Sequence, residues 1–113
     1  MTQEELYRLL VELSDVEDFV LELKPLYSKS YWGRYFPERK LIRLYALDED
    51  GNQFPDRILI REGLHELTHH IQYNHIPYWR RKRGVMHDDE FWDIYRGMLT
   101  RVQIDVKELA EVL

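Results

Sequence analysis

The amino-acid sequence predicts one domain of the α+β class over residues 1–113, with a small antiparallel or mixed sheet packed on a long central helix and further helices beside it. Apolar residues recur at helical spacing near the start of the chain and again over about 57–74, whereas the segment LIRLYAL (41–47) alternates as a strand does. The chain shows no repeats or low-complexity segment, and its length suits one modest core.

The first element expected is an amphipathic helix over residues 2–13. Thr2 can cap its start, and Glu5 lies three residues later, as a capping box requires. One face carries an apolar stripe of Leu6, Leu9, Leu10 and Leu13. Residues 16–27 fit either a short helix or a strand, and we expect Pro25 to end whichever forms.

The sheet is expected mainly between residues 31 and 47. The segment YWGRYFP (31–37) is rich in aromatic residues of high strand propensity, while Gly33 and Pro37 indicate a bend. Residues 41–47 predict a strand whose alternate residues Ile42, Leu44 and Ala46 share one face. The polar sequence DEDGN (48–52) then predicts a turn.

The remaining elements are expected to be helical. The central helix covers about 57–74 and cannot continue past Pro77. Residues 78–83 suit a short helical turn that ends before a glycine. A further helix begins near Asp88, and Asp105 with Glu108 is expected to open a separate last helix.

The composition limits the metal ligands and the binding partners that this chain can have. The chain has no cysteine, so any bound metal must be held by histidine and carboxylate. A net charge of −5 argues against nucleic-acid binding by the whole domain, although the basic run RRKR (80–83) is a local exception. The start of the chain does not resemble a secretory signal, and no apolar stretch is long enough to span a membrane, so we expect a cytoplasmic protein without membrane contact.

The segment HELTH (65–69) carries the main functional prediction. On a helix, residues four apart differ by about 40° of rotation and one turn of rise, so His65 and His69 point the same way. Both imidazoles can then bind one zinc ion at roughly 2.0–2.1 Å. Glu66 flanks that position, where its carboxylate can accept a proton from a metal-activated water that attacks a carbonyl carbon.

A third ligand is needed, and the sequence offers alternatives. We favour His87, which precedes the last long helix and can return to the site through a loop. His75 is the first alternative, although continued helix would rotate it about 240° from His69. Glu90 is a weaker alternative, because glutamate completes some zinc sites. His70 is expected to lie outside the metal's immediate ligands.

These motifs resemble a known group of proteins. HELTHHIQY followed by MHDDEFW is similar to the small single-domain zincins of the SprT-like and WLM types, over roughly residues 31–99. NHIPYW (74–79) also resembles the related YgjP-like proteins, which favours His75. The first resemblance implies a zincin-like sheet packed on the HExxH helix, His87 as third ligand with Phe91 packed behind it, and Glu66 as catalytic acid/base. In this chain Met86 replaces a glycine that often precedes the third histidine.

The function predicted is therefore a metallopeptidase with one Zn²⁺ per chain that hydrolyses peptide bonds of protein or peptide substrates. The side chains that suit oxyanion stabilisation by type are Tyr73, Tyr78, Tyr95 and Arg96. Two other functions stay open. One is a catalytically silent, zinc-stabilised binding or regulatory domain, and the other is a DNA-associated adaptor that uses residues 80–83.

Overall fold

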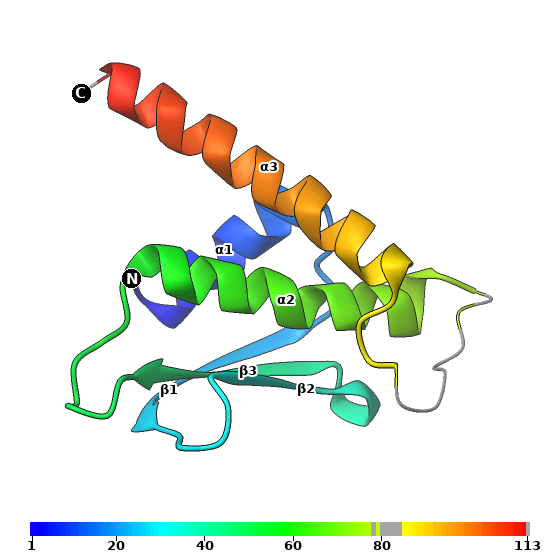
Figure 1. The fold of residues 1–113 in the computed structure, drawn as a ribbon, viewed down its shortest axis with the longest axis horizontal. Helices are drawn as coiled ribbons and strands as arrows, with labels where there is room; N and C mark the ends of the chain where they lie inside the picture. Colours follow the sequence, from blue (N-terminus) through cyan, green and yellow to red (C-terminus); the bar gives the residue numbers. More distant parts are fainter. Residues whose placement is uncertain (78, 80–84, 113) are drawn as a thin grey trace.

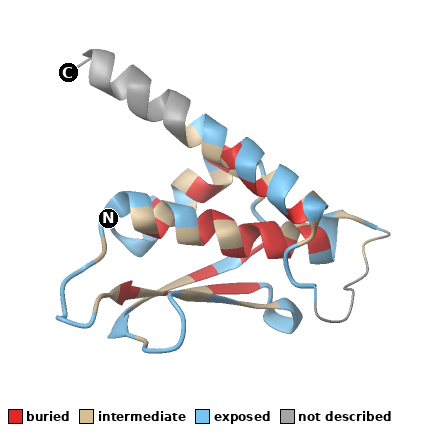
Figure 2. Cartoon of the chain, in the orientation of Figure 1, coloured by how far each residue is buried: buried red, intermediate tan, exposed pale blue. Residues whose placement is uncertain are grey.

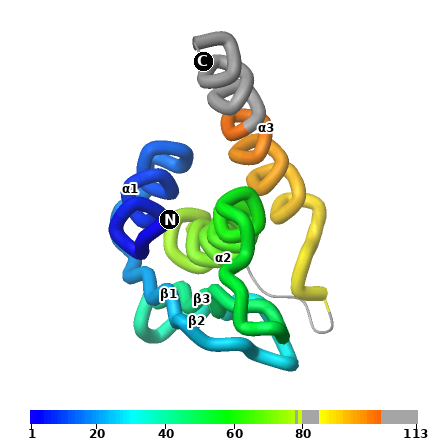
Figure 3. Tube along the Cα trace, turned by 90° about the vertical axis from the view of Figure 1, so that its left-hand side faces the viewer, coloured from blue at the N-terminus to red at the C-terminus, as the bar shows by residue number. Residues whose placement is uncertain are grey.

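The computed structural model describes residues 1–77, 79 and 85–112, with side chains described as far as residue 102. Within these residues, three α-helices and a three-stranded mixed sheet form the α+β architecture that the sequence predicts. All three helices lie on one side of the sheet (Figure 1). Seen from the end, α2 lies over the sheet, with α1 and α3 to either side of it (Figure 3).

Helix α1 spans Gln3–Ser14 and confirms the predicted capping box. The backbone N–H of Glu5 donates to Thr2 Oγ1 at 3.1 Å, and the backbone N–H of Thr2 donates to Glu5 Oε1 at 2.9 Å. Leu6, Leu10 and Leu13 are buried along the predicted stripe, and Leu9 is partly buried. The helix ends at Asp15, whose left-handed conformation turns the chain toward the sheet.

Strand β1, Val20–Tyr27, resolves the ambiguity over residues 16–27 in favour of a strand. The expectation that Pro25 would end it is wrong, because the strand continues through the proline. The strand order β1-β3-β2 places β1 at an edge, where a missing N–H is tolerated. The pairing with β3 is parallel and shifts register between Lys24 and Tyr27, which accommodates Pro25.

Strands β2, Gly33–Phe36, and β3, Leu41–Leu47, pair antiparallel around a 3-10 turn, Pro37–Arg39. Pro37 therefore marks the predicted bend, but Gly33 begins β2 instead of bending it. Ile42, Leu44 and Ala46 are buried against the helices, as their shared face predicts. The predicted turn follows, with Gly51 at a positive φ of 83°.

Helix α2, Asp56–His75, is the central element of the core. Its Leu59, Leu64 and Leu67 are buried, and the buried residues face both the sheet and the other helices (Figure 2). The helix passes close to α1, since a Cβ added at Gly63 would lie 3.0 Å from Leu10 Cδ1. It ends before Pro77, as predicted.

Helix α3 spans Asp89–Val112 as one 24-residue helix. It begins where the sequence predicts, and Asp88 caps it, because Asp88 Oδ1 accepts a hydrogen bond from the backbone N–H of Phe91 at 2.9 Å. The separate last helix predicted from Asp105 is wrong. No proline or glycine follows Gly97 before the end of the helix, so nothing in the sequence interrupts the backbone hydrogen bonds. The predicted turn over 78–83 lies outside the described residues, apart from Trp79.

Candidate metal centre

The middle of α2 presents the HELTH residues to a single pocket. Leu64 and Leu67 are fully buried and fix this helix against the core, so the helix face with His65 and His69 points toward the pocket. The two imidazole centroids lie 5.3 Å apart, one helical turn from each other. The side-chain arrangement expected for HELTH on a helix is therefore present.

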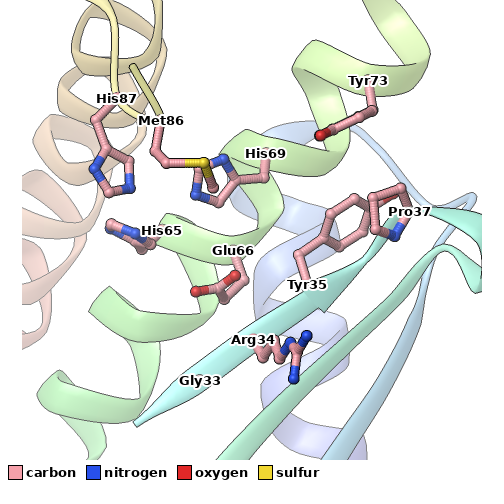
Figure 4. A pocket seen from close by; sticks show the side chains of 10 residues that line it. All are labelled: Gly33, Arg34, Tyr35, Pro37, His65, Glu66, His69, Tyr73, Met86 and His87. Carbon is pink, nitrogen blue, oxygen red and sulfur yellow. The ribbon is translucent and has the colours of Figure 1, made fainter. Parts of the chain in front are cut away.

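His87 reaches this pair from the segment before α3. Its neighbour Asp88 fixes that segment through two hydrogen bonds. Asp88 Oδ1 accepts one from Gln72 Nε2 of α2 at 2.9 Å, and Asp88 Oδ2 accepts one from Trp79 Nε1 at 3.0 Å. Ligand atoms of His65, His69 and His87 all lie within 4.8 Å of one another. The three rings face a common space (Figure 4). Three neutral imidazoles in such an arrangement fit a zinc ion.

Phe91 forms the apolar wall behind the three imidazoles. Its fully buried ring lies 5.0, 4.8 and 4.6 Å from the ring centroids of His65, His69 and His87. This contact is the packing that the resemblance implies for Phe91. An apolar wall restricts the imidazole rotamers and excludes water from one side of the group.

Burial shifts the pKa values of two pocket residues. It lowers the pKa of His65 to about 4, and His87 contributes a smaller repulsion. His65 is thus neutral near pH 7, which is the form that ligates a metal. Burial raises the pKa of Glu66 to about 8, and the nearby Glu62 adds to this rise. A cation held beside Glu66 would oppose that rise, because it favours the carboxylate form.

The carboxylate of Glu66 lines a pocket of about 440 Å³ together with the three histidines. Glu66 is only 7% exposed, and it lies beside the start of β2. A Cβ added at Gly33 would be 3.4 Å from Glu66 Cγ and 2.7 Å from Leu44 Cδ2. The missing side chain at Gly33 therefore lets β2 and Glu66 approach each other.

Sequence reasoning missed much of the pocket wall. Besides the histidines, Glu66 and Tyr73, the lining residues are Gly33, Arg34, Tyr35, Pro37 and Met86. Most of them belong to β2 or the turn after it. The aromatic YWGRYFP segment predicted a strand, but nothing in its spacing showed that this strand would lie beside HELTH.

The two alternative third ligands lie elsewhere. His75, near the end of α2, contacts Asp18 through Nε2 at 2.9 Å, and His70 Nε2 contacts the same carboxylate oxygen at 2.8 Å. Glu90 instead accepts a hydrogen bond from Gln72 Nε2 at 3.2 Å. The described ligand group therefore contains His87 and neither His75 nor Glu90.

Of the three oxyanion candidates that the structure describes, only Tyr73 lies at the pocket. Tyr73 lines it and is 40% exposed. Tyr95 is buried, and its hydroxyl donates to the Arg61 carbonyl at 3.4 Å. Arg96 is exposed on α3 and is not a lining residue. Tyr78 and the basic run 80–83 lie outside the described residues.

Among the described residues, no helix has the length and apolar character needed to cross a membrane. Comparisons of the chain with protein-family models, with curated proteins and with solved structures gave no match. Any assignment of function therefore rests on the arrangement of this pocket.

Proposed function

We propose that this protein is a zinc-dependent peptidase with a zincin-like site, in which His65, His69 and His87 hold one Zn²⁺ and Glu66 is the general base. The observation that carries the proposal is the convergence of the three imidazoles in the pocket that Glu66 also lines. Two of these histidines and Glu66 come from α2, and the third comes from a separate segment. Such convergence is much more specific than the HELTH pattern alone.

The number of ligands supports a catalytic site over a structural one. Structural zinc sites are usually closed by four protein ligands, whereas catalytic sites use three and keep one position for water. Among the described residues, the group contains three histidines and no fourth protein ligand. A bound zinc ion would lower the pKa of a coordinated water toward about 7.

Glu66 supplies the proton acceptor. Its carboxylate lies in the same pocket as the ligands and is shielded from bulk solvent by burial. In the proposed reaction, Glu66 takes a proton from the attacking water and later gives it to the departing amine. Tyr73, which lines the pocket, is retained as the side chain that stabilises the oxyanion.

The position of β2 supports a peptide as the substrate. β2 is an edge strand, so one side of its backbone is not paired within the sheet. The same strand lines the pocket through Gly33, Arg34 and Tyr35. An extended peptide can add to such an edge by main-chain hydrogen bonds, which would bring a carbonyl carbon beside Glu66. A flexible or unfolded segment fits this mode of binding, and a cytoplasmic location stays a prediction.

The test compares Glu66→Gln with the parent chain on an unfolded, fluorescently labelled protein. We expect the variant to keep about one zinc in the pocket and to lose hydrolysis by at least roughly 10²-fold, the usual contribution of a general base. Glu49→Gln, in the exposed turn after β3, removes the same charge and should leave activity unchanged. His87→Ala should lose both the pocket zinc and activity.

Two results would contradict the peptidase proposal. Hydrolysis that persists in Glu66→Gln would show that another protein or another group carries the activity. Zinc retained in the pocket without any hydrolysis that depends on Glu66 would identify a zinc-stabilised binding domain instead.

A further inference from the structure

A second group of ligand-type side chains lies at the C-terminal end of α2. Asp18, between α1 and β1, meets His70 and His75, and their ligand atoms all lie within 4.8 Å of one another. None of these residues belongs to the first group or lines its pocket. We propose that Asp18, His70 and His75 form a second site for a divalent first-row metal ion, with zinc as the probe.

The contacts converge on one carboxylate oxygen. Asp18 Oδ1 lies 2.8 Å from His70 Nε2 and 2.9 Å from His75 Nε2. Tetrahedral ligands at 2.0–2.1 Å from zinc are about 3.3 Å apart, so a bound ion requires these atoms to separate by only about 0.5 Å. Asp18 and His75 are both partly exposed, with side chains 43% and 40% accessible, which leaves room for this adjustment.

The ring of His70 is fixed by packing and by hydrogen-bond partners on both nitrogens. Its ring is fully buried and packs against Phe19 and Tyr35. Its Nδ1 lies 2.8 Å from Tyr35 Oη, and Asn74 Nδ2 donates to the same hydroxyl oxygen at 3.0 Å. Asn74 Nδ2 also lies 3.2 Å from His70 Nδ1. While Nε2–H donates to Asp18, Nδ1 accepts; when Nε2 instead binds a metal, the proton is on Nδ1 and the Nδ1–H donates to Tyr35. Metal-bound histidines typically make such a bond through their other ring nitrogen.

The electrostatic surroundings also suit a cation. The C-terminal end of a helix carries partial negative charge, and His70 and His75 lie in the last turns of α2. Lys40 Nζ opposes cation binding from 3.9 Å, but it approaches Asp18 Oδ2 and leaves Oδ1 to the imidazoles.

The second site has a chemical character different from the first. It combines two imidazoles with one carboxylate, and one protein-derived negative charge would offset part of the ion's charge. Its ligands come from α2 and from the segment before β1, so a bound ion would link these two elements. This inference does not depend on the peptidase proposal, because the two sites share no ligand.

The experiment counts zinc bound by the full chain after removal of metal with a chelator. Zn²⁺ is titrated by calorimetry, and metal content is measured by mass spectrometry after gel filtration. We expect two equivalents for the parent, and one each for Asp18→Asn and His75→Ala. Glu17→Gln, an exposed neighbour outside the group, should retain two. His87→Ala should lose the first equivalent and keep the second.

Further variants separate a metal site from a hydrogen-bonded cluster. Tyr35→Phe removes the partner of His70 Nδ1 and should weaken the second equivalent by about 10–100-fold. Circular dichroism verifies that each variant is folded. Both ligand variants change partly exposed side chains, so neither opens a buried cavity. Zinc uptake that is the same in the parent, Asp18→Asn and His75→Ala would overturn the second site, whatever His87→Ala shows.

Discussion

Gly33 determines how closely the sheet approaches the face of α2 that carries Glu66. Any larger residue would place a Cβ 2.7 Å from Leu44 Cδ2, and Leu44 is fully buried with little space to move. The same Cβ would touch Glu66 Cγ at 3.4 Å. The proposed general base, Glu66, can therefore pack closely against the edge strand β2 only because Gly33 has no side chain.

We expect Gly33→Ala to lower the free energy of unfolding by about 1–3 kcal/mol, because it overpacks the layer between α2 and the sheet. Urea unfolding measures the change. Gly97→Ala is the matched control on α3, where an added Cβ meets nothing within 4 Å. That substitution should raise stability by roughly 0.5–1 kcal/mol through helix propensity. Equal effects of the two substitutions would contradict this account of Gly33.

Tyr35 packs against the core and makes polar contacts there. Burial raises the pKa of its phenol to about 12, so the hydroxyl stays protonated and bonded to His70 and Asn74. Tyr35→Phe should cost about 1–3 kcal/mol, because it leaves the buried His70 Nδ1 without this partner. Thermal and urea unfolding provide the measurement. Tyr27→Phe, at an exposed position, should change stability by no more than about 0.5 kcal/mol.

At the residue scale, the sequence indicated His65, Glu66 and His69 because one helical turn relates them. It favoured His87 over His75 because a loop could return His87 to the site, whereas continued helix would rotate His75 away from it; the resemblances supported one residue each. The group of Asp18, His70 and His75 was not predicted. Asp18 is 52 residues before His70, and only the folded chain brings them within hydrogen-bonding distance.

Among the elements, α1 shows how local signals determine a boundary. Its capping box satisfies two backbone N–H groups that would otherwise lack helical partners. Thr2→Ala should therefore destabilise the protein by about 1 kcal/mol, whereas Thr2→Ser should retain most of the cap. Urea unfolding of the two variants tests the difference. Indistinguishable stability of Thr2→Ala and the parent would show that the first turn contributes little.

Strand β3 and helix α2 were predictable because each combines a strong hydrophobic period with clear end signals. The two wrong predictions, at Pro25 and Asp105, each applied a rule for one residue without regard to the strand or helix around it. Pro25 breaks an internal strand but is tolerated at the edge position that β1 occupies. Asp105 resembles a helix start, yet the residues before it form helix as readily, so α3 continues.

For the molecule as a whole, zinc should act as a stabilising ligand. An ion that binds only the folded state at 100 times its dissociation constant adds about 2.7 kcal/mol to the free energy of unfolding. Removal of zinc with a chelator should therefore lower the melting temperature, and restored Zn²⁺ should reverse the change. In His87→Ala this response should shrink. A melting temperature that does not respond to zinc in the parent chain would contradict metal binding at either site.

The proline in β1 also affects whether two copies of this chain can pair through their sheet edges. An open sheet with two bare edges invites edge-to-edge pairing and aggregation. Pro25 interrupts the row of donors along one margin, while the opposite margin is only the four residues of β2 and carries the charged Arg34. Both edges are thus poor templates for polymerisation, and the shorter edge, β2, stays open to a peptide that binds briefly.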